Sequence, residues 1–251
     1  MKMIQIDYHG SVAVVKLARS ITNALNLQLI TELQESLDKV NQDPDVHGIV
    51  ISSSNDKFFS IGLDIPQLYP LSEKDFMNFY QVFNQVQIDL YTVPKPTVAA
   101  VTGHAVAGGC VLALCCDYRF ISEGRKFMGL NEIKLGVSIP YPADCILRNV
   151  VGTRVARNIV DSGEFYLPEQ LLATGLVDCV LPLEDVLPKS IEKAHMVGAL
   201  PLKAFASIKQ SRVEQVEAQI KKLLKEKEEL FVKLWFSDEA REQLRKAMEK
   251  F

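Results

Sequence analysis

The sequence lacks the short motifs that mark metal-dependent, serine-hydrolase and nucleotide chemistry. It has no HExxH, GxSxG or P-loop pattern, and its four histidines are not paired at metal-ligand spacing. The pair Gly108-Gly109 lacks the third glycine of a dinucleotide-binding fingerprint. These absences disfavour metal hydrolysis, serine hydrolysis and nucleotide-driven reactions, and we expect no metal site.

Paired cysteines are also missing. The five cysteines include no CxxC pair, and their number is odd. A disulfide framework or a thiolate zinc site is therefore disfavoured, and buried reduced thiols are expected. The first ten residues, MKMIQIDYHG, contain no apolar h-region of a signal peptide. We therefore expect a cytoplasmic protein.

There is no excess of positive charge. The sequence has 28 Lys and Arg residues and 31 Asp and Glu residues, which gives a net charge of −3. Proteins that bind many nucleic-acid phosphates usually carry a basic surface, so we expect no nucleic-acid partner. A length of 251 residues with 48% hydrophobic residues is enough for a substantial buried core.

One apolar stretch imitates a membrane span. Residues 98–116 read VAAVTGHAVAGGCVLALCC, near the length that a transmembrane helix needs. Three glycines interrupt this run, and two prolines precede it. A buried strand, a glycine turn and a buried helix explain the pattern better, so we expect no membrane span.

Apolar patterning predicts alternating strands and helices over the first two thirds. Strands are expected at 12–17, 47–52, 97–102 and 118–122. Helices are expected after the capping residues Asn26 and Ser72, and at 109–116. This alternation indicates an α/β fold. From about residue 200 only helices are predicted, at 204–236 and 238–250, with an apolar stripe that includes Phe231 and Trp235.

Three segments have features suited to catalysis. In FFSIGLDI (58–65) and GHAVAGGC (103–110), glycines allow backbone N–H groups to face a cleft, and two such groups can form an oxyanion hole. In MGLNEIKLGVSIP (128–140), Glu132 lies among apolar residues, where burial would raise its pKa. Taken singly, each segment also has a purely structural explanation. The first can be a buried turn, the glycine pair of the second can serve close packing of a strand and a helix, and Glu132 can be a solvated glutamate.

Together and in this order, the segments resemble the crotonase family, the enoyl-CoA hydratases and isomerases. The similarity covers nearly the whole chain. It includes NALN at 23–26, KPTVAAVTGHAVAGGCVLALCCDYRF at 95–120 and LPEQLLATGLVDCVLP at 167–182.

The resemblance implies a crotonase-like ββα spiral core at 1–195 and a helical C-terminal trimerisation region at 196–251. It also implies a homotrimer or hexamer that binds acyl-CoA thioesters. No cofactor is expected, because coenzyme A is part of the substrate. By position in the motifs, the backbone N–H groups of Leu63 and Gly108 would form the oxyanion hole. Residues near the substrate would be Ser60, Ile61, Gly62, Asp64, Ile65, Gly109 and Asn131.

The acid–base residues indicate the reaction. Hydratases of the family carry two glutamates, and the position of the first is Val111 here, whereas Glu132 supplies the second. One glutamate can move a proton from C2 to C4, so the resemblance is strongest to monofunctional Δ3,Δ2-enoyl-CoA isomerases.

Three alternatives remain open. One is another single-acid reaction on the same fold, such as hydration, decarboxylation or dehalogenation. The others are a catalytically inactive binding or scaffold protein with the crotonase fold and, disfavoured by the charge balance, an RNA-binding protein. Lys250 is a further candidate contact for coenzyme A phosphates.

Overall fold

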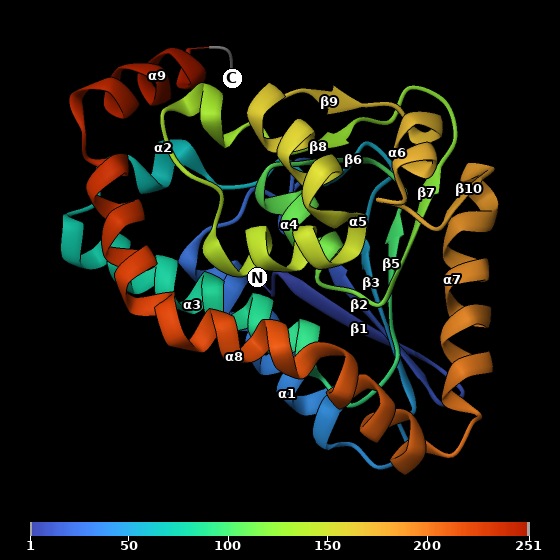
Figure 1. The fold of residues 1–251 in the computed structure, drawn as a ribbon. Helices are drawn as coiled ribbons and strands as arrows, with labels where there is room; N and C mark the ends of the chain where they lie inside the picture. The colour runs from blue at the N-terminus through green and yellow to red at the C-terminus, as the bar shows by residue number, and fades with distance from the viewer. Residues whose placement is uncertain (1, 250–251) are drawn as a thin grey trace.

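The computed structural model describes residues 2–249 and contains two β-sheets surrounded by helices (Figure 1). The larger sheet has the strand order β1-β2-β3-β5-β7-β10. Its first pair is antiparallel and every other pair is parallel. The strands are β1 (Ile4–His9), β2 (Val12–Leu17), β3 (Gly48–Ser53), β5 (Thr97–Val101), β7 (Tyr118–Ser122) and β10 (Cys179–Leu181).

Both faces of the sheet are buried at its central strands β2, β3 and β5. In β3, Ile49 and Ile51 belong to the main core, whereas Val50 faces a smaller apolar cluster on the opposite side. Helix α7 (Leu183–Gly198) covers that opposite side and contributes Val186 and Ala194. Burial on both faces explains why these central strands read as largely apolar runs, whereas the edge strand β1 alternates polar and apolar residues.

The predicted strand and helix both occur in the stretch that resembles a membrane span, but a second strand lies between them where a glycine turn was expected. Strand β5 is followed by β6 (His104–Val106) and then by helix α4 (Gly108–Leu114). Strand β6 lies in the second sheet, whose order is β4-β6-β8-β9. The other strands of this sheet are β4 (Phe58–Ser60), β8 (Met128–Gly129) and β9 (Phe165–Tyr166). Among the residues described, none of the helices is long and apolar enough to cross a membrane.

The two predicted capping residues begin the helices expected after them. The Asn26 side chain accepts a hydrogen bond from the Leu29 N–H at the start of α1 (Leu27–Gln42). Ser72 accepts one from the Asp75 N–H at the start of α3 (Glu73–Thr92). Apolar periodicity did not predict the remaining helices. These are α2 (Ile65–Leu68), η1 (Glu132–Leu135), α5 (Tyr141–Ser162), α6 (Pro168–Thr174) and α7.

The last part of the chain is helical, as expected. Helix α8 (Leu202–Trp235) lies alongside α3, and α9 (Asp238–Met248) follows it (Figure 1). The predicted division between residues 195 and 196 falls inside α7, and that division stays a prediction. Lys250 lies outside the described residues.

Candidate active site

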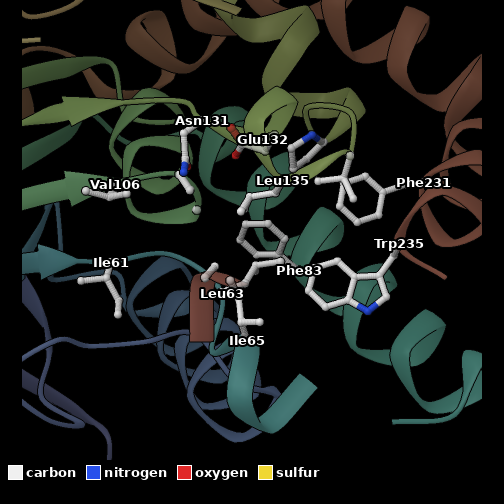
Figure 2. A pocket seen from close by; sticks show the side chains of 15 residues that line it. Ile61, Leu63, Ile65, Phe83, Val106, Asn131, Glu132, Leu135, Phe231 and Trp235 are labelled. Carbon is white, nitrogen blue, oxygen red and sulfur yellow. The ribbon is translucent and has the colours of Figure 1, made fainter. Parts of the chain in front are cut away.

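An apolar cavity of about 110 Å³ lies between the two predicted glycine segments and the Glu132 segment (Figure 2). Its walls come from both halves of the chain, including α8 and α9. The lining residues are Ile61, Leu63, Ile65, Phe83, Val106, Ala107, Gly108, Asn131, Glu132, Leu135, Val137, Pro140, Phe231, Trp235 and Ala247.

The first glycine segment presents an unused backbone donor. The Leu25 N–H donates to the Gly62 carbonyl (2.8 Å), and the Asp64 N–H donates to the Leu25 carbonyl (2.9 Å). These bonds hold the loop on both sides of Leu63. Within residues 2–249, the Leu63 N–H donates to no protein group. Gly62 has a φ of +88°, which favours glycine and permits this turn.

The second glycine segment supplies another unused donor. Ala107 precedes α4 with φ 47° and ψ −117°, a rare conformation for a residue with a side chain. Its N–H donates to the Gly129 carbonyl (2.8 Å), which fixes the turn. The N–H of Gly108, the first residue of α4, has no acceptor among the residues described. Backbone strain of this kind is concentrated at functional sites and costs about 1–3 kcal/mol.

The two donors are close neighbours. A methyl group placed on Gly62 would lie 2.8 Å from the Gly108 nitrogen and 3.0 Å from Cβ of Ala107. The absence of a side chain at position 62 therefore keeps the approach to the Gly108 N–H open. Two adjacent N–H groups that donate to no protein group are suited to bind an oxygen that gains negative charge.

Glu132 begins η1, and its side chain is only 6% exposed. One carboxyl oxygen, Oε2, is buried without a hydrogen-bond partner in the described part of the chain. Burial raises the pKa of Glu132 from 4.5 to about 7, although the N–H groups of Glu132 and Asn131 act in the opposite direction. A carboxyl group with a pKa near neutrality can both accept and donate a proton.

Among the described residues, Glu132 is the only carboxylic acid that lines this cavity. Val111, at the position of the first hydratase glutamate, is completely buried in α4 and is not among the lining residues. The other polar lining side chains are Asn131, which lies beside Glu132, and Trp235 (Figure 2). The cavity therefore offers one acid–base group in apolar surroundings.

The other predicted site residues occupy three kinds of position. Ile61, Ile65 and Asn131 line the cavity. Ser60 and Gly109 lie behind it: the Ser60 hydroxyl donates to the Asn23 carbonyl and accepts from the Gly62 N–H, and a Cβ on Gly109 would meet the Ser60 carbonyl at 2.2 Å. They hold the donor loops together from the protein interior.

Asp64 faces a second groove that adjoins the cavity. Its carboxylate pairs with Arg19 at 2.5 Å and accepts from the Gln67 N–H at the start of α2. The groove has a volume of about 530 Å³ and shares Ile61, Leu63 and Ile65 with the cavity. Its remaining lining residues are Met3, Arg19, Ser20, Thr22, Ala24, Asp64 and Pro66.

Sequence reasoning missed the contribution of the C-terminal helices. Phe231, Trp235 and Ala247 line the cavity, although they are about a hundred residues away from Glu132 in the chain. The apolar stripe of α8 indicated that Phe231 and Trp235 are buried, but it did not indicate which part of the protein they contact. Phe83, one of several aromatic residues in α3, also lines the cavity.

The fold and the site together define a class of protein: an α/β protein with a buried acid–base group beside a pair of backbone donors. More particularly, the chain belongs to the enoyl-CoA hydratase/isomerase family, also called the crotonase family, whose model matches residues 7–251. The recognition made from the motifs is confirmed.

Curated relatives include both named activities of the family. The chain is 33% identical over 189 residues to Enoyl-CoA delta isomerase 1, mitochondrial, from Mus musculus, covering 75% of this chain and 65% of the relative. The human protein of the same name is 31% identical over 200 residues, covering 79% and 66%. A Crotonyl-CoA hydratase from Syntrophomonas wolfei is 33% identical over 167 residues, covering 66% and 64%. The matches thus span just under two thirds of each relative's length.

The solved structures support the fold over the whole chain. Human mitochondrial delta3-delta2-enoyl-CoA isomerase superposes with a TM-score of 0.95 at 27% identity, covering 99% of this chain and 98% of that one. An enoyl-CoA hydratase from Bacillus halodurans gives 0.90 at 23% identity, covering 98% and 100%. At that identity the second match shows the fold alone.

Proposed function

We propose that this protein is a Δ3,Δ2-enoyl-CoA isomerase, which converts a 3-enoyl-CoA into the trans-2-enoyl-CoA. The observation that carries the proposal is that residues 2–249 place a single carboxylic acid, Glu132, in the cavity wall. Glu132 has one unpartnered oxygen, and two backbone donors of the same cavity are unused. A proton shift within the substrate needs one such group and no added reactant.

The reaction would proceed in two proton transfers. The thioester oxygen accepts hydrogen bonds from the Leu63 and Gly108 N–H groups. The Glu132 carboxylate removes a proton from C2, and the C–H electrons move into the thioester to give a dienolate whose oxygen is stabilised by both donors. The Glu132 carboxyl group then protonates C4, so that the double bond lies between C2 and C3 and the carboxylate is restored.

The surroundings of Glu132 favour isomerisation over hydration. A hydratase of this family positions water between two carboxyl groups, whereas this cavity holds one. Its walls are otherwise largely apolar, and apolar walls do not hold a water molecule in a fixed place. The dry environment also keeps the pKa of Glu132 close to that needed for a proton acceptor that must later donate.

Coenzyme A would occupy the adjoining groove. The groove meets the cavity at Leu63, one of the two proposed oxygen-binding residues. It also offers the hydroxyl groups of Ser20 and Thr22 and the guanidinium group of Arg19 to polar parts of the ligand. Coenzyme A enters as part of the substrate, and the mechanism requires no separate cofactor or metal.

The decisive test is Glu132→Gln, which keeps the shape of the side chain and removes its acid–base function. We expect kcat for 3-hexenoyl-CoA isomerisation to fall by about 10²–10⁴-fold, the range for general acid–base catalysis. Glu123→Gln is a matched control, because Glu123 is exposed and does not line the cavity. Isomerisation at the wild-type rate by Glu132→Gln would overturn the assignment.

Hydration is the second candidate, because the chain is 33% identical to a Crotonyl-CoA hydratase. Wild-type protein incubated with a trans-2-enoyl-CoA in water separates the two reactions by the appearance of 3-hydroxyacyl-CoA. Val111→Glu introduces the second carboxyl group that a hydratase carries. Hydration by the wild type faster than isomerisation would favour the second candidate. Neither reaction, together with failure to bind any acyl-CoA, would favour a catalytically inactive binding or scaffold protein.

We also infer that the protein assembles as a homotrimer or a pair of trimers. Met196, Leu200 and Ile208 are each more than half exposed, which is unusual for a group of large apolar side chains near one helix junction. Sedimentation equilibrium is expected to give three or six times the 28.1 kDa chain mass. A monomer at micromolar concentration would contradict the inference.

The cytoplasm is our proposed location. All five cysteines are free and four of them are buried, which fits a reducing compartment. Fractionation of cells that express the full chain tests this point, and recovery in an organelle would contradict it.

A further inference from the structure

One end of the cavity is closed by aromatic rings from two helices. Phe83 comes from α3, and Phe231 and Trp235 come from the end of α8. In Figure 2, Phe231 and Trp235 lie on one side of the cavity, Ile61 and Val106 lie on the other, and Glu132 and Leu63 lie between them.

The closing rings are packed against other aromatic side chains in the core. Trp235 stacks on Phe76 with 4.3 Å between ring centroids, and Phe231 stacks on Tyr80 at 4.0 Å. All four side chains are at most 2% exposed. Close-packed interiors yield little, so this end of the cavity is a fixed wall and not a flexible flap.

The second groove meets the cavity at Ile61, which lies across the cavity from Phe231 and Trp235 (Figure 2). The second groove shares Ile61, Leu63 and Ile65 with the cavity, and it contains Arg19 and two hydroxyl side chains. A thioester held at Leu63 and Gly108 with its polar part in this groove would direct its acyl chain away from Ile61. The acyl chain would then run toward Phe231 and Trp235.

We propose that Phe231 and Trp235 set an upper limit on acyl length, so that the preferred substrates are short-chain 3-enoyl-CoA thioesters. The cavity volume of about 110 Å³ leaves little space between Glu132 and this aromatic wall. The choice of 3-enoyl substrates rests on the proposed function, whereas the length limit applies to any acyl-CoA that binds here.

Trp235 provides a direct test in the unmodified protein, because it is the only tryptophan of the chain. Wild-type protein is titrated with coenzyme A and with saturated straight-chain acyl-CoA thioesters of increasing length, while tryptophan emission is recorded. Affinity is expected to rise about fourfold for each methylene that finds apolar contacts, and to stop rising when the chain reaches the wall. Emission is expected to change as that length is reached and to stay unchanged with coenzyme A alone.

Substitutions of the wall test the same limit by calorimetry. Trp235→Leu and Phe231→Leu each replace an aromatic ring by a smaller aliphatic side chain. Both are expected to move the acyl-length limit to longer chains, with about fourfold tighter binding for each methylene newly accommodated. Trp235→Phe is the intermediate variant, because it keeps one aromatic ring but loses the second ring of the indole together with an N–H that has no partner among the described residues. It is expected to move the limit least.

The outcomes separate this proposal from the proposed function. A length limit that both leucine variants leave unchanged while folded, as judged by circular dichroism, would overturn the role of the wall. Tryptophan emission that does not depend on acyl length would do the same, even if both variants failed to fold. A length limit without isomerisation of any 3-enoyl-CoA would instead leave the wall in place and refute the reaction.

Discussion

At the scale of single residues, Gly62 is proposed to affect catalysis although it has no side chain. Its positive φ of +88° turns the loop, and a Cβ at this position would come within 2.8 Å of the Gly108 nitrogen. For Gly62→Ala we expect kcat for isomerisation to fall by about 10²–10³-fold, as when one oxyanion donor is lost. Steady-state kinetics with 3-hexenoyl-CoA measure this effect.

Gly124 offers a matched control for Gly62. Its φ of +84° is nearly the same, but an added Cβ would meet no atom within 4 Å. Gly124→Ala therefore carries a similar backbone strain without blocking a donor. If Gly124→Ala lowered kcat as much as Gly62→Ala, the loss would come from strain and not from the oxyanion hole.

The sequence predicted the chemistry of single residues better than their exact positions. The apolar residues around Glu132 suggested its burial and a raised pKa, and the structure shows both, although Ile133 beside it is 49% exposed. Ser60 and Gly109 were expected near the substrate but lie behind the donor loops. The strained turn at Ala107 could not be predicted, because alanine gives no sign of a positive φ.

At the scale of helices and strands, α8 is attached to the core by a buried ion pair. The Lys209 ammonium lies 2.8 Å from the Asp117 carboxylate, and their side chains are 1% and 6% exposed. Arg212 also pairs with Asp117. Removing one partner of a buried pair costs about 3–5 kcal/mol, because the other charge is left without compensation.

For Lys209→Met we expect unfolding free energy to fall by about 3 kcal/mol, the lower end of that range, because Arg212 still neutralises Asp117. Urea unfolding at fixed protein concentration measures the change. Lys221→Met is the matched control on the same helix, since Lys221 pairs with Glu217 at the surface and such a pair contributes about 0.3–0.5 kcal/mol. Equal losses in the two variants would show that the buried pair has no special role.

Local signals predicted the elements that carry them. The capped helices α1 and α3 and the long buried strands are recognisable from a few neighbouring residues. The strands β8 and β9 have only two residues each, too few for an alternating pattern. In α5, Gly152 has a positive φ and interrupts the helix, which weakens its apolar periodicity.

At the scale of the whole molecule, burial of Glu132 links folding to pH. Its pKa is raised from 4.5 to about 7 in the folded chain, so between these values the folded state binds more protons than the unfolded state. Stability from this group is therefore complete below about pH 4.5 and is lost as pH rises through about 7. At about 1.4 kcal/mol per pKa unit, the loss is on the order of 3 kcal/mol.

Urea unfolding at a series of pH values checks this linkage. Burial also raises the pKa values of Asp89 and Asp144, so the wild-type slope contains more than one contribution. The difference between wild type and Glu132→Gln isolates the glutamate. A difference that did not change between pH 4.5 and 7 would show that Glu132 has an ordinary pKa.

The assembly of the cavity is the feature that sequence reasoning could least predict. Leu63, Gly108 and Glu132 belong to motifs that are ordered along the chain, so their convergence follows from the family resemblance. Phe231 and Trp235 reach the same cavity only because α8 packs along α3. Contacts over such sequence distances leave no trace in local periodicity.

The use of main-chain donors has a consequence for mutational scanning. An alanine scan replaces side chains and leaves every N–H in place, so it would detect Glu132 and report position 63 as tolerant. The Leu63 N–H, one of the two proposed oxygen-binding donors, would then be invisible to the commonest functional screen. Replacing the amide at Leu63 or Gly108 by an ester, through chemical synthesis or ligation, removes the donor itself and would reveal it.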